Sequence, residues 1–292
     1  MGHKAGFVNI IGNPNVGKST LMNALVGDKL SIITSKAQTT RHRILGIVNG
    51  EGYQIVYSDT PGILKPKYKL QERMLKFVTG ALSDADVLLY VTDYMDDPSK
   101  NSGFVEKLIQ VNTPLLLLVN KIDIKTDSGL KETVEKWMNT FDDVQIIPIS
   151  ALKKTNLDVV LSEIIKLLPE SPPYFPDDQL TDKTERFLVS EIIREKIILF
   201  YKQEIPYAVE VDVDSFIDKK DIIRISAKIY VTRDSQKGII IGKGGSSLKR
   251  VGTEARKDIE AFFGKKVFLE LFVKVRKDWK DNERYLKQWG YN

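Results

Sequence analysis

A glycine-rich loop near the start of the chain constrains the fold more than any other stretch. The sequence GNPNVGKS, Gly12 to Ser19, fits the pattern GxxxxGKS/T between an apolar stretch, GFVNII, and a helix-like stretch, TLMNALVG. A loop that only turned the chain would leave Lys18 unexplained, whereas exposed amides at a helix N-terminus form a phosphate site. The predicted nucleotide-binding residues of this stretch are Asn13, Pro14, Asn15, Val16, Gly17, Lys18, Ser19 and Thr20.

The order of apolar and amphipathic stretches predicts two domains in this 292-residue chain. Up to about residue 168 short apolar runs alternate with helix-like segments, which is typical of an α/β fold with a mostly parallel sheet and helices on both faces. Four prolines between 169 and 176 then interrupt the pattern. We predict a first domain over 1–170, an interdomain linker over 171–181, and a smaller α+β domain over 182–292.

The smaller domain has its own periodicity. A helix-like segment over about 183–203 precedes two alternating stretches, 209–213 and 223–229, which are close enough in sequence to form antiparallel strands. A second helical pattern follows, in which Leu248, Val251, Ala255, Ile259 and Phe262 recur, and then a third alternating stretch over 267–275. The intervening SQKGIII fits either a short helix or a strand.

Composition limits the chemistry that the chain can perform. There is no cysteine and there are only two histidines, so a metal ion must be held by oxygen ligands. The longest apolar runs are far shorter than the roughly 20 residues that span a bilayer, and the N-terminus lacks the layout of a signal peptide, so we expect a cytoplasmic protein. The net charge is +5, and the window from Lys237 to Lys280 contains twelve Lys or Arg against five Asp or Glu. A solvated surface would explain such a run if no phosphate-binding loop lay beside it.

Three further segments follow at the ends of predicted strands. DTPG, 59–62, would place the Asp59 carboxylate near magnesium and the Gly62 amide near a γ-phosphate. In NKID, 120–123, Asp123 can accept hydrogen bonds from N1 and the exocyclic amine of guanine, which argues for GTP and against a kinase that uses ATP. The segment SAL, 150–152, offers a backbone amide to guanine O6. The predicted residues are Asp59, Thr60, Pro61, Gly62, Asn120, Lys121, Asp123, Ser150, Ala151 and Leu152.

With these motifs, residues 5–168 resemble the translation-factor-like GTPases. The resemblance implies a switch threonine that closes on magnesium, and QTTRH, 38–42, looks like that segment, with Thr40 as the candidate and Thr39 as the alternative. The magnesium ligands would be Ser19, Thr40 and Asp59. Ile63 stands where Ras-like GTPases carry a water-orienting glutamine, so we expect slow turnover. Asn15 resembles the asparagine with which some relatives bind potassium, and the predicted catalytic residues are therefore Lys18, Thr40, Gly62 and Asn15.

A second glycine loop, GIIIGKGG at 238–245, has a different spacing. Only three residues separate its first two glycines, and Gly244 stands where a magnesium-binding Ser or Thr is required, so it is a poor triphosphate site. The GKGG turn resembles the GxxG loop of a KH domain, which clamps single-stranded RNA, and the resemblance covers roughly 183–277 in the type II order. It implies an RNA-binding set of Ile241, Gly242, Lys243, Gly244, Gly245, Ser246, Ser247, Lys249 and Arg250.

Together the two halves resemble the Era GTPases, on QTTRHRI, DTPG and SQKGIIIGKGG. The resemblance implies a GTP/GDP switch with Mg2+. Asn15 and Ile63 add K+ as an expected ligand, and a monomer is our default expectation. Its partners would be the small-subunit ribosomal RNA near its 3′ end and the small ribosomal subunit during assembly, with peripheral contact at the inner face of the cell membrane. The alternative is an RNA-binding module whose nucleotide site is mainly structural. The aromatic residues after the last strand, Trp279, Tyr285 and Trp289, fit either RNA stacking or, as we favour, packing of a terminal helix.

Overall fold

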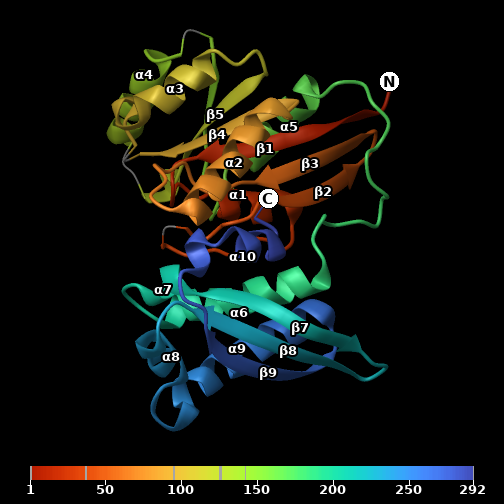
Figure 1. Cartoon of the computed structure of the whole chain (residues 1–292). Helices are drawn as coiled ribbons and strands as arrows, with labels where there is room; N and C mark the ends of the chain where they lie inside the picture. The colour runs from red at the N-terminus through yellow and green to blue at the C-terminus, as the bar shows by residue number, and fades with distance from the viewer. Residues whose placement is uncertain (1, 37, 95, 125–126, 142, 292) are drawn as a thin grey trace. The chain divides into compact units, whose positions relative to one another are not determined.

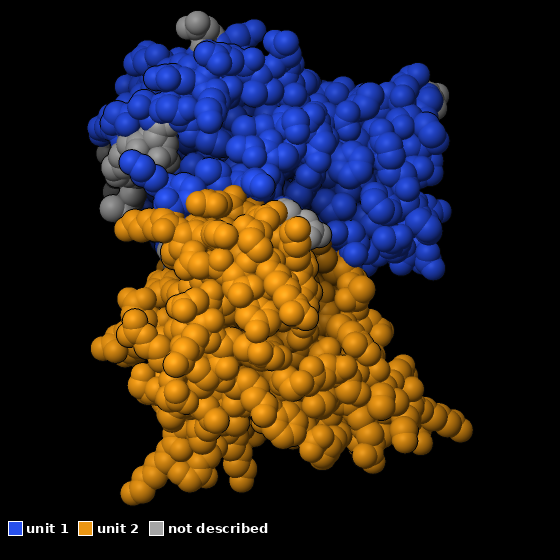
Figure 2. Space-filling view, viewed as in Figure 1, with its two compact units in different colours: residues 1–31, 40–66, 74–182 blue, residues 32–39, 67–73, 183–292 orange. Residues whose placement is uncertain are grey.

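The computed structural model describes residues 2–36, 38–94, 96–124, 127–141 and 143–291, and the chain divides into two compact units. The first, unit 1, consists of Met1–Ser31, Thr40–Pro66 and Met74–Asp182. The second, unit 2, consists of Ile32–Thr39, Lys67–Arg73 and Lys183–Asn292 (Figure 2). Two short segments from the first half of the chain therefore belong to the same unit as the C-terminal half.

Unit 1 is built on a six-stranded sheet in the order β2-β3-β1-β4-β5-β6, with only β2 antiparallel to its neighbour (Figure 1). Its central strands are runs of valine, leucine and isoleucine because both faces are covered. The strands are β1 (Lys4–Gly12), β2 (Ile44–Gly50), β3 (Tyr53–Asp59), β4 (Val87–Asp93), β5 (Leu115–Asn120) and β6 (Gln145–Pro148). The helices are α1 (Lys18–Val26), α2 (Lys69–Ser83, of which the residues to Arg73 fall in unit 2), α3 (Ser102–Ile109), α4 (Asp127–Met138) and α5 (Leu157–Leu167).

Parallel pairing brings the predicted motifs to one edge of this sheet. The register aligns Ile10 of β1 with Asp59 of β3, and Asp93 of β4 with Asn120 of β5. The glycine loop, DTPG and NKID therefore all begin where a strand ends at this edge. Ligands of open α/β sheets bind at this end of the strands.

The proline-rich stretch after α5, predicted as a linker, is hydrogen-bonded within unit 1. The buried Gln54 accepts hydrogen bonds from the Tyr174 amide at 2.7 Å and the Phe175 amide at 3.0 Å. Further along, the Ile47 amide donates to the Leu180 carbonyl at 2.9 Å, which satisfies an edge group of β2. This unit extends to Asp182.

Unit 2 is an α+β unit with the three-stranded sheet β7-β8-β9, in which β7 and β8 are antiparallel and β8 and β9 are parallel. The apolar positions of α6, α9 and the three strands form one core. The stretch SQKGIII lies in the short helix α8, which decides the alternative left by the sequence. The elements are α6 (Glu185–Phe200), α7 (Ile205–Ala208), β7 (Glu210–Asp218), β8 (Ile222–Val231), α8 (Asp234–Ile241), α9 (Ser246–Phe263), β9 (Lys266–Val275) and α10 (Glu283–Gln288).

The aromatic residues at the C-terminal end pack against one another. Trp279 is fully buried, its ring centroid lies 5.5 Å from that of Trp289, and Tyr285 stacks on Trp289 at 5.7 Å. These contacts fit the packing of a terminal helix, which is the role that we favour for these rings. One residue of the predicted apolar stripe differs, because Phe262 is exposed and Phe263 contacts the core instead. Among the described helices, none is both long enough and apolar enough to cross a membrane.

Candidate functional site

The first glycine loop passes into α1 at Gly17, which has a left-handed φ of 102°. A Cβ at this position would lie 2.3 Å from the Asn120 Nδ2 atom, so a side chain is excluded. The Asn120 side-chain Nδ2 donates to the Val16 carbonyl at 2.8 Å, and the Asn120 Oδ1 accepts from the Ala151 amide at 2.9 Å. Asn120 thus braces the glycine loop against the SAL segment, a structural role that the sequence pattern alone did not reveal.

Lys18 is buried at the start of α1. Its ammonium donates to the Gly12 carbonyl at 3.0 Å and to the Asn13 carbonyl at 2.8 Å. Burial lowers the pKa of Lys18 to about 8, although the charges of Asp59 and Asp96 oppose this shift. An anionic ligand beside the ammonium would favour its charged form, which is the electrostatic requirement of a phosphate site.

Three oxygen-bearing side chains meet beside Lys18. The Ser19 hydroxyl donates to Asp59 Oδ2 at 2.7 Å and lies 2.8 Å from the Thr40 hydroxyl, which donates to the same Oδ2 at 3.2 Å. Burial raises the pKa of Asp59 against these hydrogen bonds, and within the described residues its buried Oδ1 has no hydrogen-bond partner. A buried carboxylate with one unsatisfied oxygen, next to two hydroxyls, fits a hard divalent cation such as Mg2+.

The two switch threonines have different surroundings. The Thr39 hydroxyl is 2.6 Å from the Thr34 hydroxyl and donates to the Lys36 carbonyl at 2.6 Å. Only the Thr40 hydroxyl lies with Ser19 and Asp59. The geometry therefore favours Thr40 over Thr39 as the metal ligand.

The predicted base-binding segments are linked by a side-chain hydrogen bond. The Ser150 hydroxyl donates to Asp123 Oδ1 at 2.6 Å, which orients a carboxylate that is exposed to solvent. The Lys153 amide donates to the same hydroxyl at 3.1 Å and closes the turn. Leu152 is 71% exposed, so the far side of this turn is open. The carboxylate is thereby fixed in direction and free to accept from a base.

Two carboxylates at the end of β4 were not predicted. Asp93 pairs with the Lys121 ammonium at 2.6 Å, and Asp96 accepts from the Asn13 amide at 3.1 Å. The available signal was positional, because β4 is a continuous apolar run between two strands that carry motifs and its carboxyl end lies at the same sheet edge. Asp93 and Asp96 thus bind side chains of the NKID segment and of the first glycine loop, Lys121 and Asn13.

The segment after Asp59 is held by apolar and backbone contacts. The Thr60 hydroxyl donates to the Ile10 carbonyl at 2.8 Å, and a Cβ on Gly62 would lie 2.8 Å from Pro14 Cα. Pro61 lies between them in the chain. The Ile63 side chain packs, partly buried, against the hydrophobic core around α2, α3 and α4 and has no polar atom to orient water. Asn15 is exposed and has a φ of +66°.

The second glycine loop is a tight turn between α8 and α9. Gly242, Gly244 and Gly245 have φ values of 70°, 59° and 80°. A Cβ on Gly244 would meet nothing within 4 Å, so glycine is required here by backbone conformation, and the outer side of the turn is open to a ligand. α9 begins at Ser246, and its N-cap is Gly245, which provides no side-chain cap.

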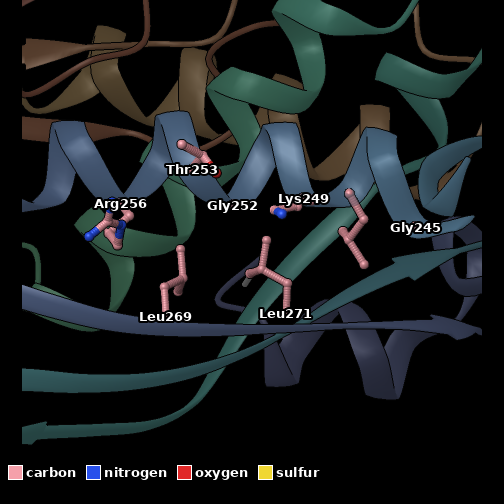
Figure 3. Close-up of a pocket in the computed structure, with 8 residues that line it drawn as sticks. Gly245, Lys249, Gly252, Thr253, Arg256, Leu269 and Leu271 are labelled. Carbon is pink, nitrogen blue, oxygen red and sulfur yellow. The ribbon is translucent and has the colours of Figure 1, made fainter.

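A groove of about 380 Å³ lies beside this loop, between α9 and β9 (Figure 3). Figure 3 shows Lys249 and Arg256 on the helix and Leu269 and Leu271 on the strand, so the cations lie on the helix wall and the strand wall is apolar. Gly252 and Thr253, which have no side chain and a short side chain, line the groove on the helix side. The full lining is Gly245, Leu248, Lys249, Gly252, Thr253, Arg256, Leu269 and Leu271.

Two members of the predicted RNA-binding set have other surroundings. The Arg250 guanidinium lies over the Phe200 ring at 4.2 Å, and Ile241 packs partly buried against the core of unit 2. Ser247 lies so close to Gly242 that a Cβ there would be 2.2 Å from the serine Oγ. Arg256 and Thr253, by contrast, line the groove although they were outside the predicted set.

Comparison with known proteins identifies the family. The family profile described as "50S ribosome-binding GTPase" matches residues 7–121, and the profile described as "KH domain" matches residues 204–280. The chain is 46% identical to GTPase Era of Staphylococcus haemolyticus over 99% of its length and 97% of that relative. The chain belongs to the GTPase Era family.

Solved Era structures share the fold over the whole chain. A crystal structure of Era in complex with MgGDPNP and nucleotides 1506–1542 of 16S ribosomal RNA has a TM-score of 0.95 at 38% identity, covering 99% of both chains. A single-residue variant of Aquifex aeolicus Era bound to GDP·AlF4− gives the same TM-score, identity and coverage. The predicted Era-type fold, with a mostly parallel α/β sheet followed by a smaller KH unit, is confirmed.

Proposed function

We propose that this Era-family chain is a GTP-hydrolysing switch that binds single-stranded ribosomal RNA near the 3′ end of the small-subunit RNA and acts in small-subunit assembly. The observation that carries the proposal is a pair of unlike phosphate sites: buried Lys18 with Ser19, Thr40 and Asp59 in one, and the open GKGG turn beside a cation-lined groove in the other. The related Era structure with MgGDPNP and 16S ribosomal RNA supports both ligands.

The residues of the first site divide the work of phosphoryl transfer. Lys18 would hold the terminal phosphates, the Gly62 amide would face the γ-phosphate, and Asp123 would accept from guanine. Ser19, Thr40 and Asp59 would hold Mg2+, which supplies positive charge where negative charge develops during transfer. If Mg2+ and the γ-phosphate hold Thr40 in the GTP state, loss of that phosphate would release residues 34–42 and 59–75. For RNA binding to follow this switch, the two nucleotide states must bind RNA with different affinity.

The Ile63 side chain has no polar atom that could orient the attacking water. We therefore propose that a monovalent cation assists GTP hydrolysis. Asn15, exposed in the first glycine loop, is the proposed K+ ligand beside the β- and γ-phosphates. We expect GTP hydrolysis to be at least about tenfold faster in potassium chloride than in sodium chloride of equal concentration, and Asn15→Ala to remove the difference; an arginine finger, where present, is worth about 10³ to 10⁵. Equal rates in the two salts would contradict the assignment.

The competing function is an RNA clamp with a structural nucleotide site. Steady-state GTP turnover, measured with and without a single-stranded RNA from the 3′ end of small-subunit ribosomal RNA, separates the two. We expect slow turnover alone and a several-fold change with this RNA, but no change with a scrambled RNA of the same length. No hydrolysis under either condition would favour the clamp.

The remaining proposals concern where the protein acts. We propose a cytoplasmic monomer with peripheral contact at the inner face of the cell membrane, on the family resemblance and on the excess of cations between 237 and 280. Cell fractionation and sedimentation of the full chain test location and oligomeric state.

A further inference from the structure

Helix α6 carries four buried charged side chains, Glu191, Arg194, Glu195 and Lys196. Buried charges are retained in proteins only when they are paired or hydrogen-bonded. Lys196 forms ion pairs with the neighbouring Glu195, at 3.2 Å, and with Asp258 of α9. Its partners therefore lie on the two helices of the C-terminal core. Arg194 is bonded differently.

The Arg194 guanidinium holds a backbone carbonyl from the first half of the chain. Its Nε and Nη2 donate to the two carboxylate oxygens of Glu191 at 2.7 and 2.6 Å, and Nη2 also donates to the Thr39 carbonyl at 2.6 Å. The side chain is 1% exposed. Burial acts to lower the pKa of Arg194, but the charge and hydrogen bonds of Glu191 raise it above its ordinary value, so the group stays charged. The carbonyl thus accepts a charge-assisted bond away from water, where such bonds are strongest.

A second cation attaches the same segment to the end of α6. The Lys36 ammonium donates to the Ile198 carbonyl and, at 2.5 Å, to the Tyr201 carbonyl. Ile198 lies in the last turn of α6 and Tyr201 is its C-cap, where the helix dipole favours a positive charge. Within the segment, the Thr34 hydroxyl accepts from the Lys36 amide at 3.1 Å. Residues 32–39, grouped with the C-terminal half in unit 2, are thus bonded to α6 and its C-cap at two positions, Lys36 and Thr39.

The carbonyl that Arg194 holds is in the peptide bond that leads to Thr40. A fixed plane for this peptide limits the backbone orientations available to Thr40. The hydroxyl of Thr40 lies with Ser19 and Asp59. We infer that Arg194 is a positioning residue for the magnesium site, acting on Thr40 through the Thr39 carbonyl. The inference rests on the proposed function, in which Thr40 is a magnesium ligand.

The test uses the full chain with Arg194→Met, Arg194→Lys and the matched control Lys196→Met, a buried cation of the same helix paired with α9. Two quantities are measured: the Mg2+ concentration that half-saturates GTP hydrolysis, and amide hydrogen exchange of the peptide over 32–40 with Mg2+ and a non-hydrolysable GTP analogue. We expect Arg194→Met to raise the half-saturating Mg2+ concentration about tenfold, as loss of a charge-assisted bond implies. Amide exchange of the peptide over 32–40 should become about tenfold faster for the same reason. Turnover at saturating Mg2+ should change little.

The controls separate this inference from the proposed function. Arg194→Lys should recover part of both effects, and Lys196→Met should leave both unchanged even if it lowers the melting temperature. Equal behaviour of Arg194→Met and Lys196→Met would overturn the positioning role. Thr40→Ala should raise the Mg2+ requirement more than Thr39→Ala; if it does not, the metal assignment itself is wrong and the inference fails with it.

Discussion

Asp123→Asn is expected to lower the affinity for GTP by about 10³-fold and to make XTP a better ligand than GTP. The carboxylate accepts from two donors on guanine, N1–H and the exocyclic amine, and each bond to a charged group is worth about 1.5–3 kcal/mol. An asparagine offers an NH2 group, which faces the guanine amine as a second donor. Xanthine has a carbonyl at that position and restores the pairing. Displacement of a bound fluorescent guanine nucleotide by XTP and by GTP measures the relative affinity of the variant for the two nucleotides.

Ser150→Ala is the matched control for this change. It removes the hydroxyl that donates to Asp123 at 2.6 Å but leaves the carboxylate in place, so GTP should weaken by only about tenfold without any gain for XTP. If Asp123→Asn weakened GTP and XTP equally, the effect would be structural, and the assignment of Asp123 to the base would be wrong. Retained preference for GTP in Asp123→Asn would contradict it directly.

Replacing Lys243 and Gly244 together by aspartate is expected to weaken binding of single-stranded ribosomal RNA by about 100-fold. The turn has open space above Gly244, and its glycines let a phosphate approach the backbone. Two new negative charges at that point repel the phosphate that the loop would clamp, and one cation is lost from the contact. Fluorescence anisotropy of a labelled RNA from the 3′ end of the small-subunit RNA, at a fixed salt concentration, measures the loss.

The control for charge alone is Lys220→Asp, in the exposed turn between β7 and β8. It lowers the net charge by two, against three for the double replacement, and lies in a different turn, so we expect less than a threefold change in RNA affinity. GTP turnover without RNA should be normal in both proteins. RNA affinity that fell equally in both would show that net charge, rather than the GKGG turn, holds the RNA.

Much of the fold and of the first site could be predicted from the spacing of motifs and apolar residues in the sequence. The first glycine loop, DTPG and NKID each end a buried strand, and because parallel strands place their carboxyl ends at one edge, order in the chain already implied a shared site. The helix after GKGG and the alternating strands of the smaller domain were equally visible, since their periodicity is set by one core. The short helix α8 was not decided by its pattern, because three consecutive isoleucines fit a helix and a strand alike.

What the tertiary structure decided concerns contacts between residues far apart in the chain. The choice of Thr40 over Thr39 depends on which hydroxyl lies with Ser19 and Asp59, and no local pattern distinguishes two adjacent threonines. The attachment of residues 32–39 to α6 through Arg194 joins positions 155 apart in the sequence. Local sequence encodes propensity and periodicity, whereas the partner of a buried charge is set by which segments the folded core brings together, and only the three-dimensional structure contains that information.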